Sequence, residues 1–182
     1  MRLRPAVFFD RDGVLNRAML ENGAPRPPRT SQEIMFISEA KPALENLRKT
    51  GFLNIVVTNQ PDVARGKTSR EFVEALHREL AEQLPVDAIY VCWHDDADHC
   101  DCRKPQPGML LQGARDFGIN LHASYMVEDR WRDIEAGRRA GCATIFIDHG
   151  YETEKTAGKV DFVTDHVGHA AKWILERQST KT

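Results

Sequence analysis

The chain has 182 residues, of which 41% are hydrophobic and 29% charged, with a formal net charge of −2. This length suits one domain with its own core, and the small net charge gives no bulk attraction to nucleic acid or to an anionic membrane. The first apolar run, residues 6–9, is too short for a signal peptide or a membrane span, so we expect a cytoplasmic protein.

Short apolar runs alternate with amphipathic stretches, a pattern typical of a parallel sheet covered by helices on both faces. Strands are predicted over residues 6–9, 53–57, 88–91, 125–127 and 144–147. Helices are predicted over about 40–50, 69–84, 107–117, 132–140 and 167–176. The sequence therefore predicts a three-layer, Rossmann-like α/β domain over residues 1–178, followed by a polar tail at 179–182.

Residues 22–31 contain Pro25, Pro27 and Pro28 together with two arginines. Such a segment is expected to be neither a regular helix nor a central strand, and we predict a loop over the carboxyl edge of the sheet. The intervals between the predicted strands are too short for a large cap domain. The site should therefore be open, with this loop contributing substrate contacts.

Polar residues follow four of the predicted strands, where open α/β sheets bind their ligands. The first strand runs into Asp10-Arg11-Asp12-Gly13, and the second into Thr58-Asn59-Gln60. The third precedes Arg103 and Lys104, and the fourth ends at Glu128 and Asp129. Because these strand ends share one edge of the sheet, the four groups are predicted to form one site.

Asp10 and Asp12 can both face a ligand, since they are two residues apart beyond a buried strand. One carboxylate can then attack phosphorus while the other donates a proton to the leaving oxygen. A solvated turn or a calcium loop is the alternative. A calcium loop needs a further acid at its end, and residues 16–20 supply none.

Cysteines and histidines gather between the third strand and Lys104. Cys92, His94, Cys100 and Cys102 make a complete tetrahedral ligand set, typical of a structural zinc site. His99 is a competing ligand, and reduced cysteines without metal are the alternative reading. Cys142 stands apart and is expected in the core.

These motifs resemble those of the haloacid dehalogenase superfamily of phosphatases over about residues 5–150. Residues 9–16 resemble its first motif, residues 58–60 its second, Lys104 its third, and Asp129 with Asp133 its fourth. Within the superfamily the chain is similar to the heptose bisphosphate phosphatases, on residues 64–66, the cysteine loop and residues 102–109. It is similar at a lower level to the histidinol-phosphate phosphatases.

The resemblance implies a role for each matching residue and a strand order of 3-2-1-4-5. Asp10 would be the nucleophile, and Asp12 the general acid and then the base. Magnesium would be bound by Asp10, Asp129 and the backbone carbonyl of Asp12. Thr58 and Lys104 would bind the phosphoryl group. The substrate contacts would come from Asn59, Gln60, Arg103 and Arg130, and zinc would be structural.

The expected function is a magnesium-dependent phosphatase that acts on the 7-phosphate of a heptose 1,7-bisphosphate, in a chain expected to be a monomer. The alternatives are a histidinol-phosphate phosphatase or a catalytically weak binding module. Glu128 is the one feature in favour of the latter, because the family usually carries glycine there. A polynucleotide phosphatase is disfavoured by the acidic chain.

Overall fold

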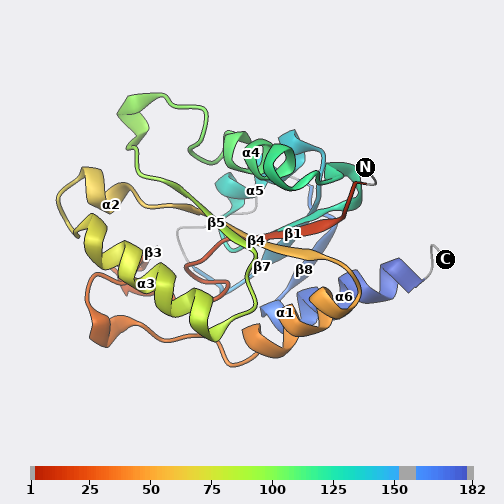
Figure 1. Cartoon of the computed structure of the whole chain (residues 1–182). Coiled ribbons are helices and arrows are strands. Elements are labelled where there is room, and N and C mark those ends of the chain that lie inside the picture. The colour runs from red at the N-terminus through yellow and green to blue at the C-terminus, as the bar shows by residue number, and fades with distance from the viewer. Residues whose placement is uncertain (1–2, 152–158, 180–182) are drawn as a thin grey trace.

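A six-stranded, all-parallel sheet forms the centre of the computed structural model, which describes residues 3–151 and 159–179 (Figure 1). The strand order is β5-β4-β1-β6-β7-β8. Their bounds are β1 Ala6–Phe9, β4 Leu53–Asn59, β5 Ala88–Cys92, β6 Tyr125–Glu128, β7 Ala143–Ile147 and β8 Phe162–Thr164. The predicted order of the first five strands is confirmed. The sixth, β8, was not predicted, because three residues carry too little pattern to identify a strand.

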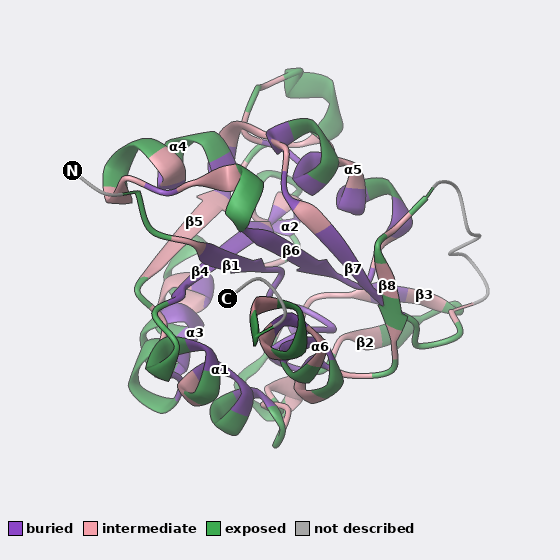
Figure 2. Ribbon diagram, turned by 90° about the vertical axis from the view of Figure 1, so that its right-hand side faces the viewer, coloured by how far each residue is buried: buried purple, intermediate pink, exposed green. Residues whose placement is uncertain are grey.

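Helices cover both faces of the sheet, which gives the predicted three layers (Figure 2). Helices α4 (Gly108–Phe117) and α5 (Trp131–Ala140) lie on one face, and α1 (Ala40–Lys49), α3 (Arg70–Gln83) and α6 (Val167–Ser179) lie on the other. Strand β1 is buried on both sides, because Phe8 packs with the α4 and α5 side and Phe9 with the α1 and α6 side. This central position makes the end of β1 the middle of the carboxyl edge.

The segment predicted as a loop between residues 22 and 31 is in part a β-hairpin, and this corrects the prediction. Strand β2 (Met19–Glu21) pairs antiparallel with β3 (Ala24–Arg26). Asn22 and Gly23 have φ values of 54° and 75°, as the tight turns of hairpins require. The dipeptide Asn22-Gly23 is the sequence signal from which this hairpin could have been predicted. Pro25 is tolerated because a two-stranded hairpin consists of edge strands alone.

The remaining elements are short. Helix α2 (Pro61–Ala64) follows β4, and 3₁₀ turns lie at Ser31–Glu33, Asp96–Asp98 and Leu121–Ala123. Helix α6 extends to Ser179, the first residue of the predicted tail, whereas residues 180–182 lie outside the described ones. Residues 3–151 and 159–179 include no separate cap domain. No helix in these ranges has the length and apolar content needed to cross a membrane.

Candidate active site

Four strand ends bring the predicted catalytic residues to one edge of the sheet. Asp10 follows β1 directly, and its backbone N–H donates to the carbonyl of Val127 in β6 at 3.0 Å. Thr58 lies near the end of β4, and Asp129 comes directly after β6. The sequence thus places these side chains together through parallel pairing of β1 with both neighbours.

Lys104 connects two carboxylates in the middle of the site. Its fully buried Nζ donates to Asp10 Oδ1 at 2.7 Å and to Glu128 Oε1 at 3.0 Å. Burial alone would lower the pKa of Lys104, but the charges of Asp10 and Glu128 raise it well above its ordinary value, so the ammonium stays charged. The Asn59 amide holds the Lys104 backbone through two hydrogen bonds of 3.1 Å each.

Asp10, Glu128 and Asp129 form a buried acidic cluster in which one oxygen from each carboxylate lies within 4.8 Å of the others. Neither oxygen of Asp129 has a hydrogen-bond partner among the described residues, and Glu128 Oε2 also has none. Burial, reinforced by the charge of Asp10, raises the pKa of both Glu128 and Asp129 well above the ordinary range. Unpaired buried carboxylates of this kind fit a hard divalent cation.

Gly13 allows the acidic cluster to form, because a side chain at this position would collide with it. A Cβ on Gly13 would lie 1.9 Å from Asp129 Oδ2, and the glycine has a φ of +90°. Both constraints exclude other residues here. The glycine of the first motif therefore sets the distance between the β1 turn and Asp129.

Asp12 is held by three side chains beyond the turn. It accepts hydrogen bonds from Arg11 at 2.8 Å, from Gln60 at 2.9 Å and from Asn16 at 3.0 Å. Burial would raise the pKa of Asp12, but the charge and hydrogen bonds of Arg11, together with the hydrogen bonds from Asn16 and Gln60, lower it. Gln60 also donates to Thr58 Oγ1 at 2.9 Å. Thr58 and Gln60, two of the three residues of the second motif, are thus buried, and Gln60 connects Thr58 to Asp12.

A cavity of about 110 Å³ opens beside Asp10 and Asp12. Four arginines line it, together with Asn59, the prolines of the hairpin region and four aspartates; the arginines are Arg65, Arg103, Arg130 and Arg132. Arg103 and Arg130 are therefore placed where substrate contacts were predicted. Arg65 and Arg132 were missed, although residues 64–66 had already drawn attention as part of a motif.

Three of these arginines are held in place by other groups. Arg103 Nε donates to Asp96 Oδ1 at 2.9 Å, and Arg130 Nη2 donates to the carbonyl of Pro25 at 2.5 Å. Arg65 forms an ion pair with Asp95. The 3₁₀ turn and the hairpin therefore orient guanidinium groups around the cavity, a role the sequence did not reveal.

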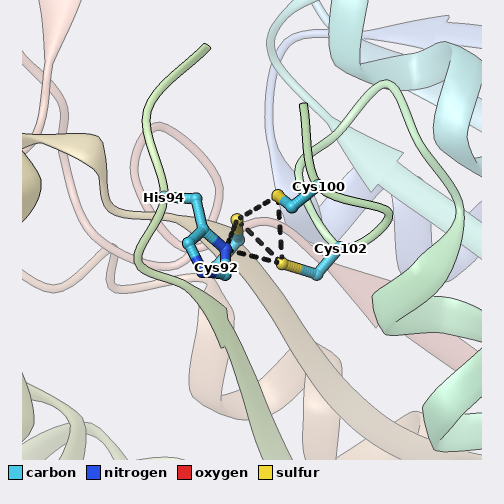
Figure 3. Close-up of side chains that lie close together, drawn as sticks. All are labelled: Cys92, His94, Cys100 and Cys102. Atoms are coloured by element: carbon cyan, nitrogen blue, oxygen red, sulfur yellow. Dashed lines mark hydrogen bonds between the residues drawn. The ribbon is translucent and has the colours of Figure 1, made fainter. Parts of the chain in front are cut away.

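Cys92, His94, Cys100 and Cys102 converge at the end of β5 (Figure 3). Five of their six ligand-atom pairs are separated by 3.1 to 3.8 Å. A tetrahedral zinc with bonds of about 2.3 Å to sulfur places neighbouring sulfurs about 3.8 Å apart. The cluster is consistent with a structural zinc, and it contains His94 rather than the competing His99. Cys142 is buried in the core, as expected.

Comparisons with known proteins agree with this geometry. A HAD-hydrolase-like family model matches residues 101–170. The chain is 32% identical to D-glycero-beta-D-manno-heptose-1,7-bisphosphate 7-phosphatase of Pasteurella multocida strain Pm70, over 94% of this chain and 97% of that protein. It is 36% identical to the Escherichia coli K12 enzyme of the same name, over 94% of this chain and 88% of that protein.

A solved structure agrees as well. The D,D-heptose 1,7-bisphosphate phosphatase from B. bronchiseptica, in complex with magnesium and phosphate, has a TM-score of 0.81 and 27% identity, covering 95% of this chain and 99% of that one. The fold and site thus define a phosphoric monoester hydrolase of the HAD-like class. Within that class, the chain belongs to the family of the heptose bisphosphate 7-phosphatases.

Proposed function

We propose that this phosphatase is magnesium-dependent and works through a covalent phosphate on Asp10. The observation that carries the proposal is the fully buried Lys104 ammonium, 2.7 Å from Asp10 Oδ1, beside the unpaired oxygens of Asp129. This arrangement combines a nucleophile, a fixed positive charge and a set of free cation ligands. Phosphoryl transfer needs such positioning and charge compensation more than it needs covalent chemistry from the protein.

In the first step, an Asp10 oxygen attacks phosphorus while the bond to the leaving oxygen breaks. Asp12 must carry a proton in the substrate complex, although Arg11 favours its charged form in the free site. It donates that proton to the leaving oxygen. In the second step, Asp12 takes a proton from water, the water oxygen bonds to phosphorus, and the bond from phosphorus to Asp10 breaks. Thr58 and Lys104 bind the phosphoryl oxygens. A magnesium ion held by Asp10, Asp129 and the carbonyl of Asp12 would supply further charge compensation there.

The placement of Asn59 and Gln60 suggests that they act by positioning. Asn59 binds the backbone of Lys104, and Gln60 is fully buried between Asp12 and Thr58. Arg103 and Arg130 are better placed for the substrate itself, because both line the cavity. We assign these roles within one phosphatase domain over residues 1–178.

We propose the 7-phosphate of D-glycero-D-manno-heptose 1,7-bisphosphate as the bond that is cleaved. Four arginines around a cavity next to Asp10 match a substrate with a second phosphate, since guanidinium groups bind phosphates in a bidentate manner. Histidinol phosphate has one phosphate, so it offers no second anionic group to these arginines. The names of the relatives point to the same substrate.

A substrate panel tests this proposal. Phosphate release should be measured with the heptose 1,7-bisphosphate, histidinol phosphate and a 3′-phosphorylated oligonucleotide, at equal concentrations and with magnesium. The heptose bisphosphate should give the highest kcat/KM by at least tenfold. A higher kcat/KM with histidinol phosphate would overturn the choice of substrate and leave the phosphatase mechanism standing.

We further propose that zinc holds the loop of residues 92–102 in place. Cys100→Ser and Cys102→Ser should lower activity and thermal stability together, because the binding energy of a closed zinc site is also folding energy. Purified protein should contain about one zinc per chain. Cys142→Ser is the matched control, because this buried cysteine lies outside the cluster. Active, folded protein without zinc in metal analysis would contradict the proposal.

Glu128 is expected to change the magnesium requirement. Glu128→Gly removes one buried carboxylate of the acidic cluster and one acceptor of Lys104. The magnesium concentration for half-maximal rate should shift severalfold, while calorimetry should show the same direction of change in magnesium affinity. Far-ultraviolet circular dichroism checks that the fold is kept. Superimposable magnesium titrations of the two proteins would show that Glu128 has no influence on the cation.

A further inference from the structure

Arg11, the residue between the two catalytic aspartates, is a fully buried cation with a fixed set of partners. Its Nε and Nη2 donate to both oxygens of Asp12 over distances of 2.8 to 3.1 Å. Its Nη1 lies 2.8 Å from Nε2 of His77, a residue of helix α3 that is 8% exposed. One planar group thus connects a helix on one face of the sheet to the general acid.

The chemistry of this contact determines the protonation state of His77. A guanidinium has no lone pair to offer, so Arg11 must donate and His77 Nε2 must accept. The imidazole is therefore neutral, with its proton on Nδ1. Burial and the adjacent charge of Arg11 lower the pKa of His77 to about 3, in agreement with this geometry. The ring of Trp93 lies beside the imidazole, with centroids 6.5 Å apart.

We propose that His77 is a positioning residue for Asp12 and acts through Arg11, an inference that rests on the proposed role of Asp12 as general acid. A guanidinium presents its donors in a rigid fork, so an acceptor on Nη1 sets the direction in which Nε and Nη2 point. Without that acceptor, a buried charged N–H group is left unsatisfied, which is costly. The fork then turns toward another acceptor or water, and the two-point contact with Asp12 is lost.

The test compares three substitutions of His77 on substrates with different leaving groups. His77→Gln keeps an acceptor oxygen, His77→Leu removes it, and His77→Asn keeps polarity on a side chain too short to reach Arg11. An alkyl phosphate needs leaving-group protonation, whereas dinitrophenyl phosphate does not. The useful quantity is kcat/KM, which reports the steps up to formation of the phospho-enzyme.

His77→Leu and His77→Asn should lower kcat/KM for the alkyl phosphate by about tenfold or more, a part of the ~10²–10⁴ that general acid catalysis typically supplies. With dinitrophenyl phosphate their kcat/KM should stay within about twofold of the parent enzyme. His77→Gln should restore most of the loss. If His77 had only a structural role, its loss would lower kcat/KM for both substrates by the same factor. Equal losses on the two substrates, or no loss at all, would overturn the proposal.

Two further variants distinguish a failure of the positioning role of His77 from a failure of the proposed mechanism. Leu76→Ala removes buried packing from the same helix and no hydrogen-bond acceptor, so it should show no preference between the substrates. Asp12→Asn should show the full leaving-group effect. If Asp12→Asn lacks that effect, the proposed mechanism fails. If Asp12→Asn has it and His77→Leu does not, the positioning role of His77 alone fails.

Discussion

Replacing Asp10 by asparagine is expected to abolish phosphate release, because the amide keeps the shape of the side chain and loses its nucleophilicity. Lys104 retains a partner in this variant, since Glu128 Oε1 lies 3.0 Å from its Nζ. The site should therefore stay assembled, and substrate should still bind. The measurement is phosphate release together with substrate binding by calorimetry. Activity like that of the parent enzyme would rule out covalent catalysis by Asp10.

Stereochemistry at phosphorus gives the independent check. Two successive in-line displacements, onto Asp10 and then onto water, retain the configuration of a chiral phosphate, whereas one direct attack by water inverts it. We expect retention. Acid quenching during turnover should also trap a phosphate label on the peptide that contains Asp10. Inversion would end the covalent interpretation even if the variant were inactive.

Asp10→Asn should at the same time stabilise the metal-free protein. Three carboxylates and one ammonium are buried together, and burial raises the pKa of Asp10, Glu128 and Asp129. Removing one carboxylate relieves repulsion without leaving Lys104 unpaired. Denaturant unfolding in the presence of a chelator should show a gain of roughly 0.5–2 kcal/mol, the range common for stabilising substitutions. The cation-binding cluster thus lowers the stability of the metal-free protein.

The sequence predicted the sheet and the catalytic edge because both depend on local patterns. The mainly apolar runs 6–9 and 53–57, each followed by polar residues, located the end of β1 and the end of β4. Three short strands, β2, β3 and β8, were not predicted, because three residues do not establish a periodicity. The hairpin could have been found, since Asn22-Gly23 is a strong turn signal.

Partners that act across the fold were harder to predict. Nothing in the sequence pairs Arg11 with His77, which are 66 positions apart, or joins Arg130 to the carbonyl of Pro25. These contacts arise only when α3 and the hairpin pack against the carboxyl edge. Arg11 itself was given no role from the sequence, although a buried arginine next to an acid determines how that acid is held.

Asp12→Asn is expected to slow turnover by ~10²–10⁴, the usual contribution of general acid–base catalysis. It should also destabilise the protein, in contrast to Asp10→Asn. Arg11 is fully buried and forms its ion pair with Asp12 at 2.8 Å. Removing one partner of a buried pair leaves an uncompensated charge, which costs about 3–5 kcal/mol. The asparagine oxygen still accepts one hydrogen bond, so the loss should fall near the lower end.

The two half-reactions separate the acid role of Asp12 from its base role. With a good leaving group, the variant needs no proton donor to form the phospho-enzyme, but it still lacks the base that activates water. Phosphate should therefore accumulate on Asp10, visible as a rapid burst of leaving group followed by a slow steady state. With an alkyl phosphate, the first step is slow and no burst should appear. A burst of equal size with both substrates would show that another residue protonates the leaving oxygen. If neither substrate gave a burst, Asp12 would not be the base in the hydrolysis of the phospho-enzyme.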